Sequence, residues 1–180
     1  MAKMYILKIA YIIMMQAKLI NDITDLSWLS RAFDNEIKRR VFEEVSKDWV
    51  TMEKIESEYG EEGKKALKFF EKVKMVETRW SMSENGKAKK EYHAFYSAFH
   101  INVMTSIEMI RDVFSVILID EKEFREIENR IYEFVGDDGE LGRDVERKFT
   151  LSPVQMRCIV KRSEKLEYKG MKIERIREIE

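Results

Sequence analysis

The chain has 180 residues, a formal net charge of −1, 37% charged residues and 44% hydrophobic residues. This balance excludes a disordered polyelectrolyte and a membrane bundle, and it predicts a soluble globular protein. The length allows either one sizeable core or two small domains. Glutamate and lysine abound while glutamine occurs only twice, a bias typical of heat-adapted proteins with surface ion-pair networks.

The sulfur and imidazole content is low. Cys158 is the only cysteine, and His93 and His100 are the only histidines. The chain therefore forms no internal disulfide and has no Cys/His zinc framework. We expect a cytoplasmic protein with no metal and no cofactor. Cys158 lies in the run VQMRCIVKR, where it is either a small packed residue or a redox switch.

The N-terminal run MYILKIAYIIMMQAKLI is apolar but is interrupted by Lys8 and Lys18. It is short for a spanning helix and lacks the small-residue cleavage pattern of a signal peptide. Three interpretations remain open: a signal or anchor, a packing or dimer-forming segment, and an over-extended start with initiation near Met14 or Met15. We expect no membrane partner.

Capping residues and apolar spacing predict four helices in the first third of the chain. They are expected at about 26–33 after Asp25, at 35–47 after Asp34, from Thr51 to Gly60, and at 63–74. The fourth helix places apolar residues on one face and lysines largely on the other: Ala66, Phe69, Phe70 and Val73 against Lys64, Lys65, Lys68 and Lys72. Helix, glycine-containing turn and helix make a helix-turn-helix arrangement.

A β-hairpin is predicted directly after this pair of helices. The run MVETRWSM alternates as a strand, SENGK carries an Asn-Gly turn signal, and AKKEYHAFYSAF is a second strand. A hairpin placed after a recognition helix is the wing of a winged helix, and this one carries Lys87, Lys89 and Lys90 at its tip and flank.

The chain also shows a weak internal repeat. A shift of 90 positions superposes Ile37 on Ile127 and Val45 on Val135, with the apolar pattern kept without a gap. In the second copy Ser152 is the expected N-cap of a helix that ends near residue 162, and YKGMK is the expected turn of a short hairpin. The alternative is chance similarity between two small amphipathic units.

A broad apolar stripe follows the first hairpin, in the run INVMTSIEMIRDVFSVILID. It is wider than a helix packed on one neighbour needs, so we expect it to pack on both lobes or on a partner chain. The predicted fold is therefore mainly α with small β-hairpins (α+β), with two winged-helix lobes joined by a long helix. The expected domains are an N-terminal winged-helix DNA-binding domain at 18–100, a connecting and dimerisation helix at 101–120, and a C-terminal winged-helix-like domain at 121–180.

Charge is segregated along the chain. Residues 61–90 carry nine bases and five acids, and residues 154–177 carry eight bases and three acids. Both positive stretches coincide with a predicted helix and hairpin, the electrostatic pattern of a surface that binds double-stranded DNA. The candidate DNA-binding residues are Lys64, Lys65, Lys68, Lys72, Arg79, Lys87, Lys89, Lys90, Gln155, Arg157 and Lys161.

No catalytic arrangement is found in the sequence. The chain has no phosphate-binding glycine loop, no nucleophile elbow and no HExxH motif. We expect no enzyme activity. The recognition helix at 63–74 lacks Arg, Asn and Gln, the best base readers. This keeps open an alternative function, a winged-helix protein-interaction module of the transcription or replication machinery.

The runs FDNEIKRRVFEEV, ALKFFEKVKMVETRW and GKAKKEYHAFYSAF resemble those of ArsR-type winged-helix transcription regulators, in particular an archaeal branch with an extra C-terminal region. The resemblance covers about residues 18–177. It implies a homodimeric DNA-binding regulator, a repressor that occludes a promoter, with a possible small-molecule or protein effector. The family's metal sensors place paired cysteines in the helix before the recognition helix, and the corresponding run here, TMEKIESEY, contains none.

Overall fold

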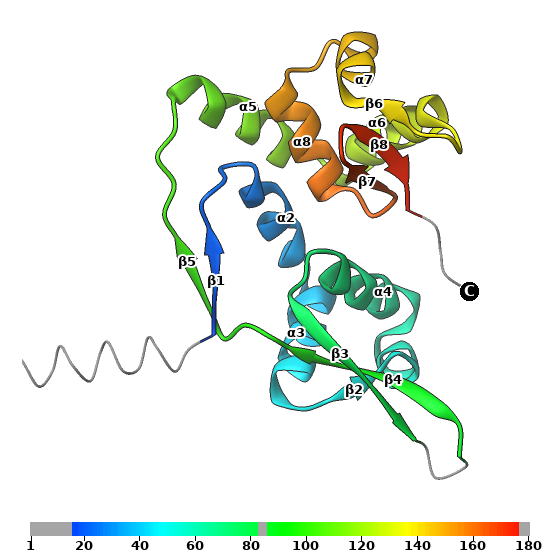
Figure 1. The fold of residues 1–180 in the computed structure, drawn as a ribbon. Helices are drawn as coiled ribbons and strands as arrows, with labels where there is room; N and C mark the ends of the chain where they lie inside the picture. The colour runs from blue at the N-terminus through cyan, green and yellow to red at the C-terminus, as the bar shows by residue number, and fades with distance from the viewer. Residues whose placement is uncertain (1–15, 83–85, 177–180) are drawn as a thin grey trace, which may run out of the picture. The chain divides into compact units, whose positions relative to one another are not determined.

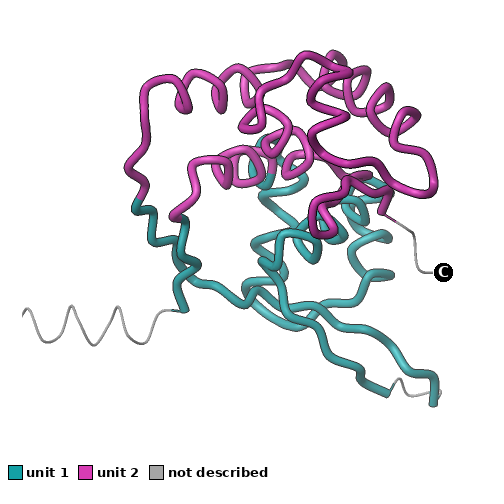
Figure 2. Tube along the Cα trace, turned by 45° about the horizontal axis from the view of Figure 1, so that its top comes forward, with its two compact units in different colours: residues 1–20, 32–102 teal, residues 21–31, 103–180 magenta. Residues whose placement is uncertain are grey.

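The computed structural model describes residues 16–82 and 86–176. The chain divides into two compact units (Figure 2). Unit 1 runs up to Ile20 and continues over Ala32–Asn102, and unit 2 comprises Asn21–Arg31 and the chain from Val103 onward. The fold is mixed α/β, with helices and small sheets in both units.

The described residues of unit 1 form two helices and two sheets. Its elements in chain order are β1 (Ala17–Ile20), α3 (Glu36–Lys47), β2 (Val50–Thr51), α4 (Met52–Lys72), β3 (Val76–Met82), β4 (Ala88–Ala94) and β5 (Ala98–Ile101). Strands β2, β4 and β3 form an antiparallel sheet in that order. Phe69 and Phe70 of α4 are buried beside Val41 and Val45 of α3, so the helix pair and this sheet share an apolar core.

Capping explains where the helices of unit 1 begin. Thr51 accepts a hydrogen bond from the backbone N–H of Lys54, as predicted. For α3 the predicted cap was wrong by one residue. Asn35, not Asp34, accepts from the N–H of Lys38, while the carboxylate of Asp34 pairs with the Lys38 side chain.

The described residues of unit 2 form the other helices, apart from the last residue of α2, and one sheet. Its elements are α2 (Asp25–Ala32, apart from its last residue), α5 (Ile107–Ile117), α6 (Glu121–Val135), β6 (Glu140–Leu141), α7 (Gly142–Phe149), α8 (Pro153–Arg162), β7 (Leu166–Lys169) and β8 (Lys172–Arg175). The antiparallel sheet has the order β6-β8-β7. Its core is formed by Phe124, Ile131, Met156, Ile159 and Ile173.

The two units repeat one order of elements at a spacing of 90 residues. In each, a helix is followed by a two-residue strand, a helix, a further helical segment and a hairpin, and the short strand pairs with the second strand of the hairpin. Strand β6 begins 90 positions after β2, and Val45 and Val135 are both buried. The periodicity read from the sequence is thus present in the order of elements.

One strand prediction is corrected by the structure. The predicted strand AKKEYHAFYSAF is two strands, because β4 ends at Ala94 and β5 begins at Ala98. Strand β5 pairs in parallel with β1, placing Ala17 opposite Ala98. Part of the predicted Asn-Gly turn, residues 83–85, and the N-terminal run up to residue 15 lie outside the described residues.

Helix α2 begins one residue earlier than predicted. Asp25 is its first residue, and the backbone N–H of Thr24 donates to the carboxylate of Asp22 just before it. In the predicted connecting segment 101–120, helix α5 covers Ile107–Ile117, with Ser106 as its N-cap.

Candidate nucleic-acid interface

Helix α4 is two helical segments joined at a glycine. Gly60 has φ +66° and ψ −161°, a conformation that residues with a Cβ rarely adopt. Three residues later, a Cβ on Gly63 would lie 2.5 Å from the Cβ of Tyr59 and 3.1 Å from Cγ2 of Ile55. The second segment therefore approaches the first as closely as a glycine allows, which fixes the turn of the predicted helix-turn-helix.

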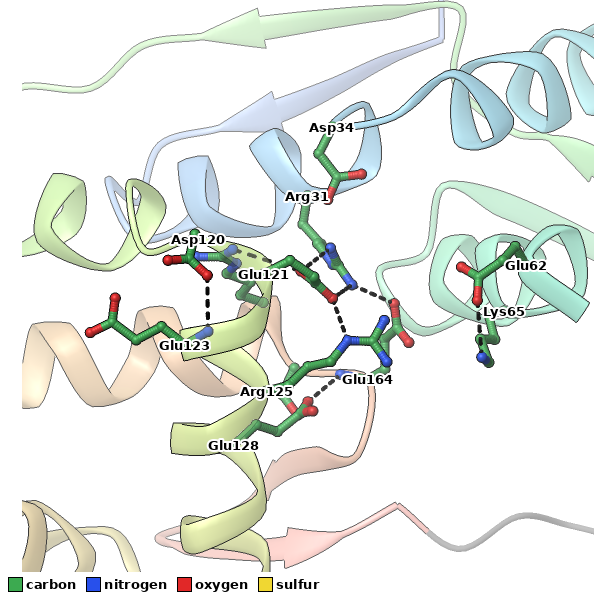
Figure 3. Close-up of polar contacts among 12 residues, drawn as sticks. Arg31, Asp34, Glu62, Lys65, Asp120, Glu121, Glu123, Arg125, Glu128 and Glu164 are labelled. Carbon is green, nitrogen blue, oxygen red and sulfur yellow. Dashed lines mark hydrogen bonds and ion pairs between the residues drawn. The ribbon is translucent and has the colours of Figure 1, made fainter.

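The second segment of α4 carries four of the predicted DNA-binding residues: Lys64, Lys65, Lys68 and Lys72. The amine of Lys64 lies 3.4 Å from Oε1 of Glu56, and the amine of Lys65 lies 3.1 Å from Oε1 of Glu62 (Figure 3). The charge of Glu56 is the main cause that raises the pKa of Lys64 above its ordinary value. Exposed pairs of this kind are weak, so an incoming phosphate is able to displace the carboxylates.

The hairpin β3–β4 extends beyond the helices of its own unit (Figure 1). Its register divides the predicted cations between two faces, because side chains alternate along each strand. Arg79 and Lys89 lie on one face and Lys90 lies on the other, while Lys87 precedes β4 and is exposed. The predicted wing residues thus surround the hairpin instead of lining one side of it.

Arg79 is held by contacts that the sequence did not reveal. Its guanidinium carbon lies 4.1 Å from the centroid of the Trp49 ring, and its Nε donates to Glu91 at 2.8 Å. Trp49 in turn stacks on His93 with ring centroids 5.2 Å apart. The hydrogen bonds from Arg79 and then Lys89 hold the pKa of Glu91 below its usual range. Arg79 is therefore positioned on the sheet before any ligand binds.

On the face of the hairpin that carries Lys90, helix α4 reaches no farther along the strands than Lys90 itself. Its amine contacts the carboxylate of Glu71, in the last turn of α4, and lies 5.2 Å from the centroid of the Tyr92 ring. Tyr92 is buried, whereas Trp80, opposite Lys90, is 72% exposed. The alternation in MVETRWSM predicts a strand but gives no signal that its outer part lies bare.

In unit 2 the predicted site residues are placed differently. Gln155 completes the capping box of α8 by accepting from the N–H of Ser152, and its Nε2 donates to Ser115 of α5 at 3.0 Å. Lys161 donates to Asp22, Thr24 and Asp25. Arg157 is exposed on α8. The structure does not bring these three side chains together on one open surface.

Half of the residues of α8 are buried. Met156, Cys158, Ile159, Val160 and Arg162 are buried, while Pro153 and Arg157 are exposed. A helix that enters a DNA groove needs one side accessible. The position of α8 in the element order matches the second segment of α4, and five of the ten residues are buried in each of the ranges 63–72 and 153–162.

A network of charged side chains stabilises unit 2. Arg31 is 8% exposed and donates to both carboxylate oxygens of Glu121 at 2.6 and 2.9 Å and to Glu164 at 3.1 Å (Figure 3). Arg125 also donates to Glu121, at 2.7 Å. These bonds link α2, α6 and the segment before β7, and they compensate the charge of the buried guanidinium.

The structure offers little to metal or thiol chemistry. Among residues 16–82 and 86–176, no group of three or more His, Cys, Asp or Glu side chains is arranged to hold a metal ion. Cys158 is fully buried, and burial raises the pKa of its thiol to about 11. Of the two roles considered for Cys158, a packed residue and a redox switch, the structure supports the packed residue, because a redox switch needs an accessible thiolate. No helix within the described part of the chain is long and apolar enough to cross a membrane.

A helix-turn-helix followed by a basic hairpin is typical of DNA-binding transcription regulators. The sequence model of one such family, described as ArsR transcriptional regulator, matches residues 20–177. The chain belongs to this family, which confirms the resemblance to ArsR-type regulators; the archaeal branch with an extra C-terminal region stays a prediction. Comparisons with curated proteins and with solved structures return no match.

Proposed function

We propose that the protein is a repressor that binds duplex operator DNA as a homodimer in the cytoplasm. In this proposal the second segment of α4 lies in the major groove, and the hairpin β3–β4 contacts the flanking backbone as a wing. The observation that carries the proposal is the order helix, glycine break, helix and basic hairpin in a member of a transcription-regulator family.

The two repeated units support a division of labour along the chain. We propose residues 18–100 as the winged-helix DNA-binding domain, 101–120 as a connecting and dimerisation segment, and 121–180 as a second winged-helix-like domain. The shared strand orders β2-β4-β3 and β6-β8-β7 support two winged helices. An archaeal, heat-adapted origin and a regulatory effector, either a small molecule or a protein, belong to the same proposal.

DNA contacts are proposed mainly for unit 1, through Lys64, Lys65, Lys68, Lys72, Arg79, Lys87, Lys89 and Lys90. In unit 2, Arg157 is the accessible candidate. Gln155 and Lys161 would have to leave the hydrogen bonds that hold them before they contact a nucleic acid.

Dimerisation is supported by one face of α5. Ile107 is 85% exposed, and Ile110, Phe114 and Leu118 are also exposed at spacings of three and four residues. Such an apolar stripe on a helix is the seam used by helices that pack on a second copy. Monomeric soluble proteins seldom leave a contiguous apolar stripe in water.

A protein-interaction module is the second candidate function. It is favoured by the glutamates that pair with Lys64 and Lys65, since these acids would also repel phosphate. It is further favoured by the hydrogen bonds that already hold Gln155 and Lys161 of α8.

The test is fluorescence anisotropy of a mixed-sequence duplex titrated with the protein at several salt concentrations. For a DNA-binding surface, log K falls against log salt with a slope of about −0.9 for each neutralised phosphate. The triple variant Lys64→Ala, Lys65→Ala, Lys68→Ala should bind more weakly and with a shallower slope. The control Lys122→Ala, Lys148→Ala, Lys172→Ala removes the same charge from unit 2. Equal losses in both variants would exclude α4 as the interface, and no binding at low salt would favour the interaction module.

A further inference from the structure

Two large apolar side chains on the hairpin β3–β4 are left in water. Trp80 is 72% exposed and Met82 is 70% exposed. They are two positions apart on β3 and therefore share one face of the hairpin. Monomeric proteins scatter single apolar residues over their surface, but a tryptophan and a methionine side by side mark a binding surface.

The position of the pair in the sheet makes it accessible from the side. Strand β3 is an edge strand of the sheet β2-β4-β3. Helical cover of this face ends at Lys90, whose amine contacts Glu71 of α4, and Met82 lies farther toward the tip, opposite Ala88. The two side chains therefore project from one face of the outer part of the hairpin, on its edge strand, past the end of α4.

The charges around the pair favour a polyanion as its partner. Lys90 lies opposite Trp80 on the same face, Arg79 and Lys89 lie on the other face of the same two strands, and Lys87 precedes β4. Residues 79–91 carry four bases against two acids, Glu84 and Glu91, so this part of the hairpin is net positive. Apolar side chains framed by cations match a sugar and base surface framed by phosphates.

From these observations we propose that Trp80 and Met82 form a wedge that enters the minor groove of bound DNA, partly unstacks a base step and bends the duplex. The inference rests on the DNA-binding function proposed above. A hairpin of two strands about 4.8 Å apart, with its side chains, is too wide for a groove of about 6 Å. The hairpin therefore enters only if the groove widens, and apolar side chains inserted from the edge strand β3 widen it by bending the DNA toward the major groove.

The bend is the property that separates this inference from simple backbone contact. Operators that contain flexible pyrimidine–purine steps at the wedge position should be preferred, because those steps deform at the lowest energy. The wing then adds sequence preference to a recognition segment that carries lysines but no Arg, Asn or Gln.

The experiment uses the full-length protein and a mixed-sequence duplex of about 30 base pairs with a donor and an acceptor dye at its two ends. Binding is followed by anisotropy and bending by energy transfer. Wild type should shorten the end-to-end distance as expected for a bend of roughly 20–90°. The variant Trp80→Ala, Met82→Ala should still bind, with affinity lowered about tenfold, and should leave the duplex straight.

Met171→Ala is the matched control, because Met171 is 81% exposed on the turn between β7 and β8. It should bind and bend DNA as wild type does. If wild type binds without bending, or if the double variant bends DNA equally well, the wedge is wrong while the proposed function stands. If wild type does not bind DNA at low salt, both fail. A double variant whose only change is a lower oligomeric mass would assign the pair to a contact between copies and overturn the wedge.

Discussion

Gly63 sets the distance between the two segments of α4. The space for its Cβ is already occupied by the Cβ of Tyr59 and the side chain of Ile55, a buried core residue. Any larger residue must push the segments apart or move Ile55 within a packed interior. The geometry of the proposed DNA-binding surface therefore depends on the packing of Gly63 against Tyr59 and Ile55.

We expect Gly63→Ala to lower the free energy of unfolding by about 1–3 kcal/mol, because it overpacks the contact between the two segments. Urea denaturation measures the effect. Ser57→Ala, at an exposed position of the first segment, is the control and should stay within about 0.5 kcal/mol of wild type. An unchanged free energy of unfolding for Gly63→Ala would show that the two segments can accommodate a Cβ at this position.

Cys158 predicts a loss of stability at alkaline pH. Burial raises its pKa from 9.0 to about 11, so above pH 9 the thiol ionises in the unfolded chain but not in the folded one. Ionisation then lowers the free energy of the unfolded state, so the stability of the folded state should fall between pH 9 and about pH 11. The pH dependence of unfolding measures this, and Cys158→Ala should flatten the curve over that interval.

A thiol reagent gives an independent check of the same residue. At pH 8 the native protein should react slowly, because Cys158 is fully buried and protonated, and it should react rapidly in urea. Fast reaction of the native protein would contradict the packed role. The sequence suggested this role from the apolar surroundings of Cys158, but burial depends on α5 and α2, which are distant in sequence.

At the scale of elements, the N-terminus of α8 joins two helices. Ser152 accepts from the N–H of Gln155, and its hydroxyl donates to Oδ2 of Asp112 on α5 at 2.7 Å. The same hydrogen bond is the first cause that lowers the pKa of Asp112. One side chain thus caps α8 and attaches it to α5.

Ser152→Ala should lower the free energy of unfolding by about 1–2 kcal/mol through loss of the cap. It should also raise the pKa of Asp112 toward 3.8, which NMR titration of the carboxyl carbon would follow. Ser115→Ala, which removes the acceptor for Gln155 but leaves the cap, is the control. If Ser152→Ala and Ser115→Ala lower the free energy of unfolding equally, the cap at Ser152 contributes no more to stability than the hydrogen bond between Gln155 and Ser115.

Elements whose signals are local could be predicted from the sequence. Ser152 and Pro153 fix the start of α8, and Gly170, with φ +62°, fixes the turn between β7 and β8. The short strand β2 was not predicted, because two residues cannot show alternation. The pairing of β1 with β5 was not predicted either, since parallel strands about 80 residues apart leave no mark on local sequence.

The sequence predicted which residues make up the candidate site, but it did not predict the contacts that hold their side chains. The sequence located the basic residues of α4 and the hairpin, and the structure shows what holds several of them. Arg79 lies on Trp49, a residue 30 positions away whose role no local pattern reveals. Gln155 looked equipped to read bases, but its amide is used inside unit 2, which only a three-dimensional structure can show.

At the scale of the whole molecule, the exposed face of α5 predicts the oligomeric state. Ile107→Glu should convert a dimer to a monomer, because a charge at the seam would have to be buried without a partner. Light scattering coupled to size exclusion should then give the chain mass of 21.6 kDa instead of twice that value. Met171→Glu, at a similarly exposed apolar position, should leave the dimer intact. A monomeric wild type would rule out this interface.

Unit 2 is built from two separated stretches of chain, and this has a consequence for synthesis on the ribosome. Arg31 of α2 bonds to Glu164, 133 residues later. At about 5–20 residues per second, α2 waits roughly 7–27 seconds for that partner. Unit 1, encoded almost entirely in between, is complete first. The nascent protein therefore holds a finished unit 1 while the side chain of Arg31 has not yet met Glu164.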